Sequence, residues 1–143
     1  MDHPQGLSYE ALEVGMKASI TKTVTESDVN LFAEVSGDRN PVHLDEEFAR
    51  TTPFGRRIAH GSLVQSLITP VFGLEMPGIG TIALETSARF IKPVFLGDTV
   101  TATAEVAEKL PDKKWVRMNC LWTNQRGETV AVGQALMIPP AGS

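Results

Sequence analysis

An aspartate and a histidine lie close together in a stretch of the chain that shows little sequence periodicity. Residues 36–45 read Ser-Gly-Asp-Arg-Asn-Pro-Val-His-Leu-Asp, which places Asp38, Asn40 and His43 around a proline. A carboxylate and an imidazole on non-helical backbone are the usual groups for moving a proton to or from water, and loops commonly carry them. We predict that Asp38 and His43 hold one water between them. The alternative is that Asp38 caps a turn and His43 only packs.

A second candidate, His60-Gly61, directly precedes the most apolar helical pattern in the chain. The first amides of a helix have no intrahelical acceptor, so the Gly61 amide can bind an oxygen that gains negative charge during a reaction. Glycine also lets a ligand approach the backbone closely. The alternative is that Gly61 only begins the helix and that His60 makes a structural hydrogen bond.

Other catalytic arrangements have weaker support in the sequence. Asp38, His43 and His60 lack the spacing that is typical of zinc ligands, so we predict no metal. The serines of the apolar helix have no Gly-x-Ser-x-Gly motif around them, which argues against a serine nucleophile. The single cysteine, Cys120, lies in a strand-like run and is predicted to be a buried thiol.

The elements that must position these residues follow from the hydrophobic pattern. A first helix begins at Thr25, with an acid three residues later, and ends at Gly37. Residues 37–59 show little periodicity and predict a long functional loop. Residues 61–72 predict a helix that is apolar on most of its circumference, which Pro70 kinks or ends. Period-two alternation predicts strands over residues 17–24, 82–90, 100–106, 116–123 and 129–138.

Length and composition exclude several classes of protein. The 143 residues, 42% hydrophobic and 21% charged, predict one globular domain. The net charge is −4 and basic residues are scattered, whereas nucleic-acid binding needs a concentrated basic face. No apolar run approaches the ~20 residues that span a bilayer, and the first residues do not resemble a signal peptide. With one cysteine, which cannot form an internal disulfide, the sequence predicts a cytosolic protein.

The two candidate motifs together resemble the signature of the MaoC-like, (R)-specific enoyl-CoA hydratases. They are residues 36–45 and the later Phe-Gly-Arg-Arg-Ile-Ala-His-Gly of residues 54–61. Residues 12–15 are similar to the family's opening and residues 90–98 to its strand-turn after the helix. The likeness extends over about residues 12–139. It implies an α+β hotdog fold, in which an antiparallel sheet wraps around a central helix, within one domain of residues 1–143.

The resemblance also implies a reaction and roles for residues. This family hydrates trans-2-enoyl-CoA to (R)-3-hydroxyacyl-CoA as dimers or dimers of dimers, without a metal or redox cofactor. By position, Asp38 and His43 would activate the water, and the Gly61 amide would bind the thioester oxygen. Asn40 would shape the loop, and Thr69 stands where one type of relative carries serine. Further residues would bind the substrate, the leucines in the acyl pocket and the basic residues near CoA: Leu63, Leu67, Arg56, Arg57 and Lys92.

Two other functions remain open at this point. An acyl-CoA thioesterase can share the same fold, because fold alone does not choose a reaction. Many hotdog thioesterases resemble one another in carrying an acid in the central helix, and residues 61–72 contain none. A non-catalytic acyl-CoA-binding subunit would have no need for both Asp38 and His43. We expect at least a homodimer, because the edges of such a sheet need pairing or cover.

Overall fold

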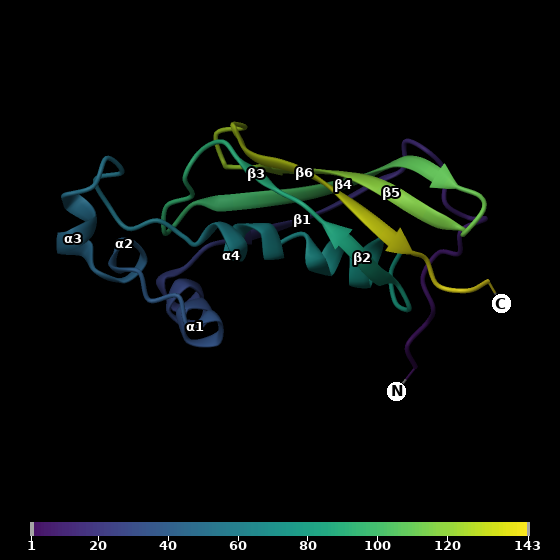
Figure 1. Cartoon of the computed structure of the whole chain (residues 1–143), viewed down its shortest axis with the longest axis horizontal. Helices are drawn as coiled ribbons and strands as arrows, with labels where there is room; N and C mark the ends of the chain where they lie inside the picture. The colour runs from purple at the N-terminus through teal and green to yellow at the C-terminus, as the bar shows by residue number, and fades with distance from the viewer. Residues whose placement is uncertain (1, 143) are drawn as a thin grey trace.

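The computed structural model describes residues 2–142, in which six strands form one antiparallel sheet (Figure 1). The strand order is β1-β4-β5-β6-β2, and β3 also pairs with β6. The strands are β1 Lys17–Thr23, β2 Ile82–Thr86, β3 Arg89–Phe90, β4 Thr99–Leu110, β5 Trp115–Thr123 and β6 Thr129–Ile138. The helical elements are α1 Glu26–Ser36, α2 Pro41–Leu44, α3 Glu46–Arg50, α4 Gly61–Ser66 and the π-helical segment η1 Val71–Glu75.

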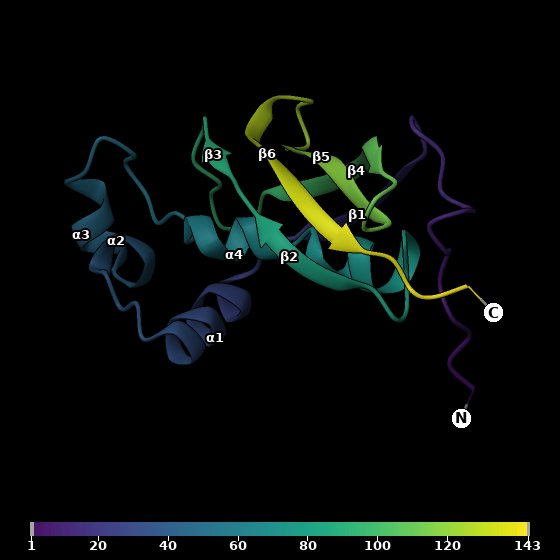
Figure 2. The ribbon, with the colours of Figure 1, turned by 45° about the vertical axis from the view of Figure 1, so that its right-hand side comes forward.

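The sheet curls over α4 and the helical turns that follow it (Figure 1). Helices α1, α2 and α3 gather toward one end of the sheet, and the two ends of the chain lie toward the other (Figure 2). Most of the buried apolar side chains belong to one cluster, to which the sheet and the segment from α4 to η1 both contribute. The arrangement confirms the α+β hotdog fold that was expected from the resemblance.

Strands β4 and β5 pair over a long stretch, with one register shift between Val106 and Glu108. Their side chains alternate between buried and half-exposed positions, as the period-two pattern predicts. Small residues of β4 face large residues of β5, so that Ala102 pairs with Trp122 and Val106 with Met118. All four of these side chains are almost completely buried. Burial of apolar surface, at roughly 25 cal/mol per Å², therefore anchors these strands over the central helix.

The central helix is shorter than the predicted range of residues 61–72. Helix α4 ends at Ser66, and a turn leads into the π-helical segment η1. Pro70 has no amide hydrogen for the Ser66 carbonyl, which accepts the hydroxyl of Thr69 instead, at 2.8 Å. The predicted effect of Pro70 is thus confirmed, and the continuous helix is not. None of the helices within residues 2–142 is long and apolar enough to cross a membrane.

Helix α1 confirms the predicted capping signals. Thr25 and Asp28 form a reciprocal capping box at its start, and Gly37 follows its end with a left-handed φ of 79°. The prediction of a long loop after Gly37 was wrong, because α2 and α3 lie within it. Each of the two helices begins at a side chain that accepts a backbone N–H: Asn40 accepts that of Val42, and Asp45 accepts that of Phe48.

The predicted strand over residues 82–90 is divided into β2 and β3. The strand is interrupted at Ser87 and Ala88, which lie close to Gly133 of β6. A Cβ atom on Gly133 would lie 1.9 Å from the Ser87 carbonyl oxygen, so only glycine permits this approach. All five residues of β2 are exposed, although their alternation predicted one buried face. Strand β2 also lies at an edge of the sheet.

Candidate active site

Asp38 stands directly after the glycine that ends α1. Its backbone N–H donates to the Ser36 hydroxyl at 3.1 Å, and its Oδ1 accepts the backbone N–H of Asn40, also at 3.1 Å. The Asn40 side chain in turn accepts the Val42 N–H and begins α2. Asn40 therefore shapes this turn, as expected. Because Oδ1 is engaged, Oδ2 is the carboxylate oxygen that remains to face the site, and the side chain is half exposed.

His43 lies on α2 rather than on irregular backbone, which corrects the sequence-based expectation. Its Nδ1 is 2.8 Å from the Ile58 carbonyl oxygen. Since a carbonyl can only accept, the proton is assigned to Nδ1, and Nε2 carries a free lone pair. That Nε2 is 4.0 Å from Asp38 Oδ2, beyond the range of a direct hydrogen bond. The structure thus brings together the two residues that the sequence singled out.

The surroundings of His43 favour the neutral imidazole. Burial lowers its pKa below the ordinary value, and the adjacent His60 also lowers it. The hydrogen bond to Ile58 and the carboxylate of Asp38 act in the opposite direction without reversing the shift. A neutral ring with an exposed lone pair on Nε2 can accept a proton near neutral pH.

His60 completes the cluster, and it makes the structural hydrogen bond that was the alternative to a role for the His60-Gly61 pair. Its ring stacks on that of His43 with centroids 3.8 Å apart and planes at 24°. Its Nε2 lies 2.9 Å from the Asp38 carbonyl oxygen, so Nε2 donates to it. The sequence drew attention to His60 only through its position before Gly61. Its contacts with Asp38 and His43 could not be predicted, because those residues are distant in the chain.

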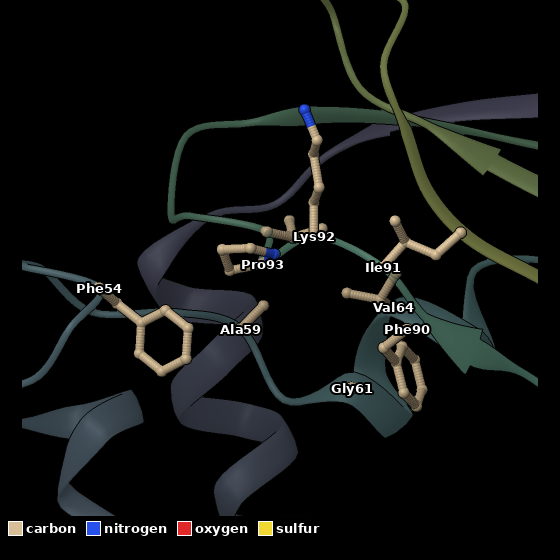
Figure 3. Close-up of a pocket in the computed structure, with 9 residues that line it drawn as sticks. Phe54, Ala59, Gly61, Val64, Phe90, Ile91, Lys92 and Pro93 are labelled. Carbon is tan, nitrogen blue, oxygen red and sulfur yellow. The ribbon is translucent and has the colours of Figure 1, made fainter.

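A largely apolar pocket of about 270 Å³ opens beside Gly61 (Figure 3). Gly61 lies at the start of α4, and a Cβ atom there would lie 3.0 Å from the ring of Phe90. The Gly61 backbone is therefore tightly approached by a side chain of this chain, and the close approach of a ligand stays a prediction. The pocket is lined by Phe54, Ala59, Gly61, Val64, Phe90, Ile91, Lys92, Pro93 and Val94.

The residues expected to line an acyl pocket are placed differently. Leu63 belongs to the buried core and Leu67 packs against it, and neither lines the pocket of Figure 3. Val64, one position after Leu63, does line it. Thr69 is exposed, and its hydroxyl donates to a backbone carbonyl. The prediction placed the acyl pocket along residues 61–71 without naming Val64 or Phe90. Only the fold determines which face of α4 the pocket meets, and only the fold brings Phe90 of β3 beside Gly61.

The basic residues have distinct positions. Arg56 is exposed, and its guanidinium lies 3.9 Å above the Phe95 ring. Arg57 instead joins elements, because it donates to the His43 carbonyl oxygen at 2.7 Å and lies 3.3 Å from Glu26 of α1. It therefore supports the position of His43.

Lys92 lines the pocket with its backbone and stem, while its ammonium group points away from it (Figure 3). That group pairs with Glu128. Hydrogen bonds from Lys92, Asn124 and Arg126 lower the pKa of Glu128 to about 2.

Asp38, His43 and His60 each place one potential metal-ligand atom within 4.8 Å of the others. Nδ1 of His43 and Nε2 of His60 already donate hydrogen bonds to backbone carbonyl oxygens. The remaining His60 nitrogen is fully buried. Only Nε2 of His43 and Oδ2 of Asp38 then converge, whereas zinc sites generally use three or four protein ligands. The donor set thus fits a metal poorly, and metal-free chemistry stays a prediction.

Comparisons with known proteins agree with this geometry. Residues 9–124 match the family described as MaoC like domain. An (R)-specific enoyl-CoA hydratase of Rhodospirillum rubrum is 44% identical over 93% of this chain and 92% of its own length. A 3-hydroxybutyryl-CoA dehydratase of Methylorubrum extorquens is 43% identical over 94% and 85%. The unliganded R-hydratase PhaJ1 of Pseudomonas aeruginosa superposes with a TM-score of 0.92 at 48% identity, covering 99% of this chain and 90% of that one.

Proposed function

This chain belongs to the MaoC-like domain family, and we propose that it is an (R)-specific enoyl-CoA hydratase. The reaction adds water across the double bond of a trans-2-enoyl-CoA and yields an (R)-3-hydroxyacyl-CoA. The relatives named for hydration and for the reverse dehydration support this assignment. The observation that carries it here is the facing pair of Asp38 Oδ2 and His43 Nε2.

The distance between these two atoms suits a shared water. At 4.0 Å they are too far apart for a direct hydrogen bond, yet one water at about 2.8 Å from each can bind both. The Nε2 lone pair of His43 would accept one proton of that water, and Oδ2 of Asp38 would accept the other hydrogen bond. Both groups thereby orient the water oxygen toward the substrate.

The chemical step needs an acid as well as a base. The water oxygen bonds to the β-carbon while the π electrons move toward the thioester, which forms an enolate. A proton from the Asp38–His43 pair then bonds to the α-carbon, and the net change is the addition of one water. No other reactant is needed for this step, and the absence of a redox cofactor stays a prediction.

The pocket next to Gly61 supplies a place for the acyl group. Its lining is mainly apolar, as an acyl chain requires, and Val64 and Phe90 face the space beside Gly61 (Figure 3). We propose that the Gly61 amide donates to the thioester oxygen and stabilises the enolate. The CoA moiety would extend past the exposed Arg56.

The exposed edge of the sheet supports a proposal about the oligomeric state. Strand β2 exposes all of its residues, including Ile82 and Leu84, and an apolar edge strand normally requires a partner. We propose a homodimer or a dimer of dimers that covers it. A location in the cytosol, without nucleic-acid or membrane partners, stays a prediction from composition.

Hydration is tested by incubating the purified protein with crotonyl-CoA. We expect the absorbance of the conjugated enoyl thioester to fall and 3-hydroxybutyryl-CoA to accumulate, without release of free CoA. Release of free CoA without a hydroxyacyl product would support a thioesterase. Binding of crotonyl-CoA without either change would support a non-catalytic acyl-CoA-binding subunit.

A further inference from the structure

His60 is the one buried imidazole for which the proposed reaction has no role. Its exposed fraction is 2%, and it lies at the residue before α4. Its ring contacts two others, with the centroid of Phe32 of α1 at 4.9 Å and that of His43 of α2 at 3.8 Å. The side chain therefore connects the three helices whose ends form the site.

The polar contact of His60 is with the backbone of Asp38. Its Nε2–H donates to the Asp38 carbonyl oxygen at 2.9 Å. The backbone N–H of Asp38 is already bound to Ser36, and its Oδ1 to Asn40. With the contact from His60, every backbone polar group of Asp38 has a partner, and the direction of Oδ2 is fixed relative to His43.

Packing alone does not account for an imidazole at this position. The Nδ1 atom of His60 is fully buried and meets no hydrogen-bond partner within residues 2–142. An unsatisfied buried nitrogen is destabilising, and a phenyl ring would fill similar space without it. The Nε2–H bond to Asp38 is the contact that a phenyl ring could not replace.

We propose that His60 is a positioning residue for the hydration reaction: its Nε2–H holds the Asp38 backbone and its ring holds the plane of His43. This role rests on the proposed function, because it sets the distance between Oδ2 of Asp38 and Nε2 of His43. One side chain thereby locates both members of the pair.

The contact between the rings of His60 and His43 also affects the protonation of His43. The groups that face this imidazole are Asp38 after α1 and His60 before α4, and Arg57 binds its backbone carbonyl. The electrostatic effect of His60 lowers the pKa of His43, opposite to that of Asp38. His60→Phe places a side chain without an ionisable group beside His43, and it should therefore raise the pKa of His43 toward its ordinary value.

Two substitutions separate the hydrogen bond from the ring. His60→Phe keeps an aromatic ring and removes the N–H, whereas His60→Gln removes the ring and keeps an N–H at a similar reach from the backbone. For His60→Phe we expect a fall in kcat on the order of 10-fold, with KM for crotonyl-CoA changed less than about twofold. We expect His60→Gln to retain more of kcat than His60→Phe does.

A measurement on the protein without substrate keeps the inference separate from the proposed function. The chain has three histidines, so NMR titration can follow His43 directly, with the exposed His3 as an internal reference. We expect a higher pKa of His43 in His60→Phe than in the unmodified protein, and no change at His3. The acid limb of the rate profile should move to higher pH by the same amount.

The outcomes discriminate between the two claims. An unmodified protein that does not hydrate crotonyl-CoA would remove the proposed function, whereas the NMR titration would still report on the contact. An active protein in which His60→Phe leaves both kcat and the pKa of His43 unchanged would overturn the role of His60. Equal losses in the Phe and Gln variants, with thermal stability lowered in parallel, would reduce His60 to a packing residue.

Discussion

The ladder of β4, β5 and β6 and the segment from Gly37 to Gly61 are held in place by different forces. In the ladder, apolar side chains are buried against the central helix over long pairings, and they alternate with half-exposed ones along most of β4 and β5. In the segment, two helices of four and five residues are fixed mainly by side-chain bonds to the backbone. Helices this short are unstable alone, so the segment depends on those polar contacts. A change in the ladder should cost stability, and a change in the segment should cost activity.

The largest expected effect comes from the segment. Asp38→Asn and His43→Ala each remove a group that the water would contact, and each should reduce hydration by on the order of 100- to 10,000-fold. The double variant should be little worse than either single variant, because the two groups act as a unit. Turnover and thermal unfolding measured together would check this. Near-normal turnover in either single variant, or strictly multiplied losses, would remove the shared water.

The ladder offers the opposite test. Met118 is fully buried opposite Val106, so Met118→Ala leaves a cavity under the sheet. We expect the free energy of unfolding to fall by about 2–5 kcal/mol. The kcat of the molecules that remain folded should change less than about twofold. Denaturant unfolding followed by activity at low denaturant measures both quantities, and a large loss of kcat without loss of stability would erase the contrast between the two regions.

Gly61→Ala tests the end of the segment, which contacts Phe90 of β3, a strand that pairs with β6 of the ladder. Its Cβ would lie 3.0 Å from the ring of Phe90, which is half exposed and can shift. We expect a folded protein with kcat/KM lowered on the order of 10-fold, because the methyl group and the displaced ring crowd the pocket. Phe90→Ala in the same chain should recover part of the loss. If the double variant loses the product of the two single losses, Gly61 and Phe90 are not coupled through this contact.

A change in pH should have a smaller effect on the rate of hydration. Hydration requires the neutral His43 ring, whose pKa is lowered by burial, so the rate should fall only at a pH below the ordinary value of about 6.5. The same shift contributes to stability. Because the unfolded chain binds the proton more readily, the contribution is full above about pH 6.5 and is lost as the pH falls through the folded pKa. In His43→Ala this part of the dependence of unfolding on pH should be absent, while the rest of the curve is kept.

The contrast between the two regions also explains what the sequence could predict. The ladder was predictable because period-two alternation over 9 to 12 residues reports burial directly. Helices α2 and α3 were missed because four or five residues are too few to display a helical period. The break between β2 and β3 depends on Gly133, more than 40 positions away. A pattern within one segment carries no information about such a contact.

Part of the candidate site could be predicted because it lies within one short segment of the chain. Asp38, Asn40 and His43 are neighbours in the chain, so their types and spacing indicated a shared role. His60 and Arg57 act on that trio from 14 to 22 positions away, through a stack and backbone carbonyls that only the fold brings into reach. Val64 rather than Leu63 lines the pocket because of the rotation of α4 beneath the sheet.

The stereochemistry of hydration tests the shared water most directly. Oδ2 of Asp38 and Nε2 of His43 lie 4.0 Å apart, so both can reach the double bond from one face only. Crotonyl-CoA incubated in heavy water should therefore give (R)-3-hydroxybutyryl-CoA with oxygen and deuterium added to the same face. Chiral analysis of the product, with the position of deuterium determined by NMR, reads out both features. An (S) product, or addition of oxygen and deuterium to opposite faces, would contradict hydration by this pair.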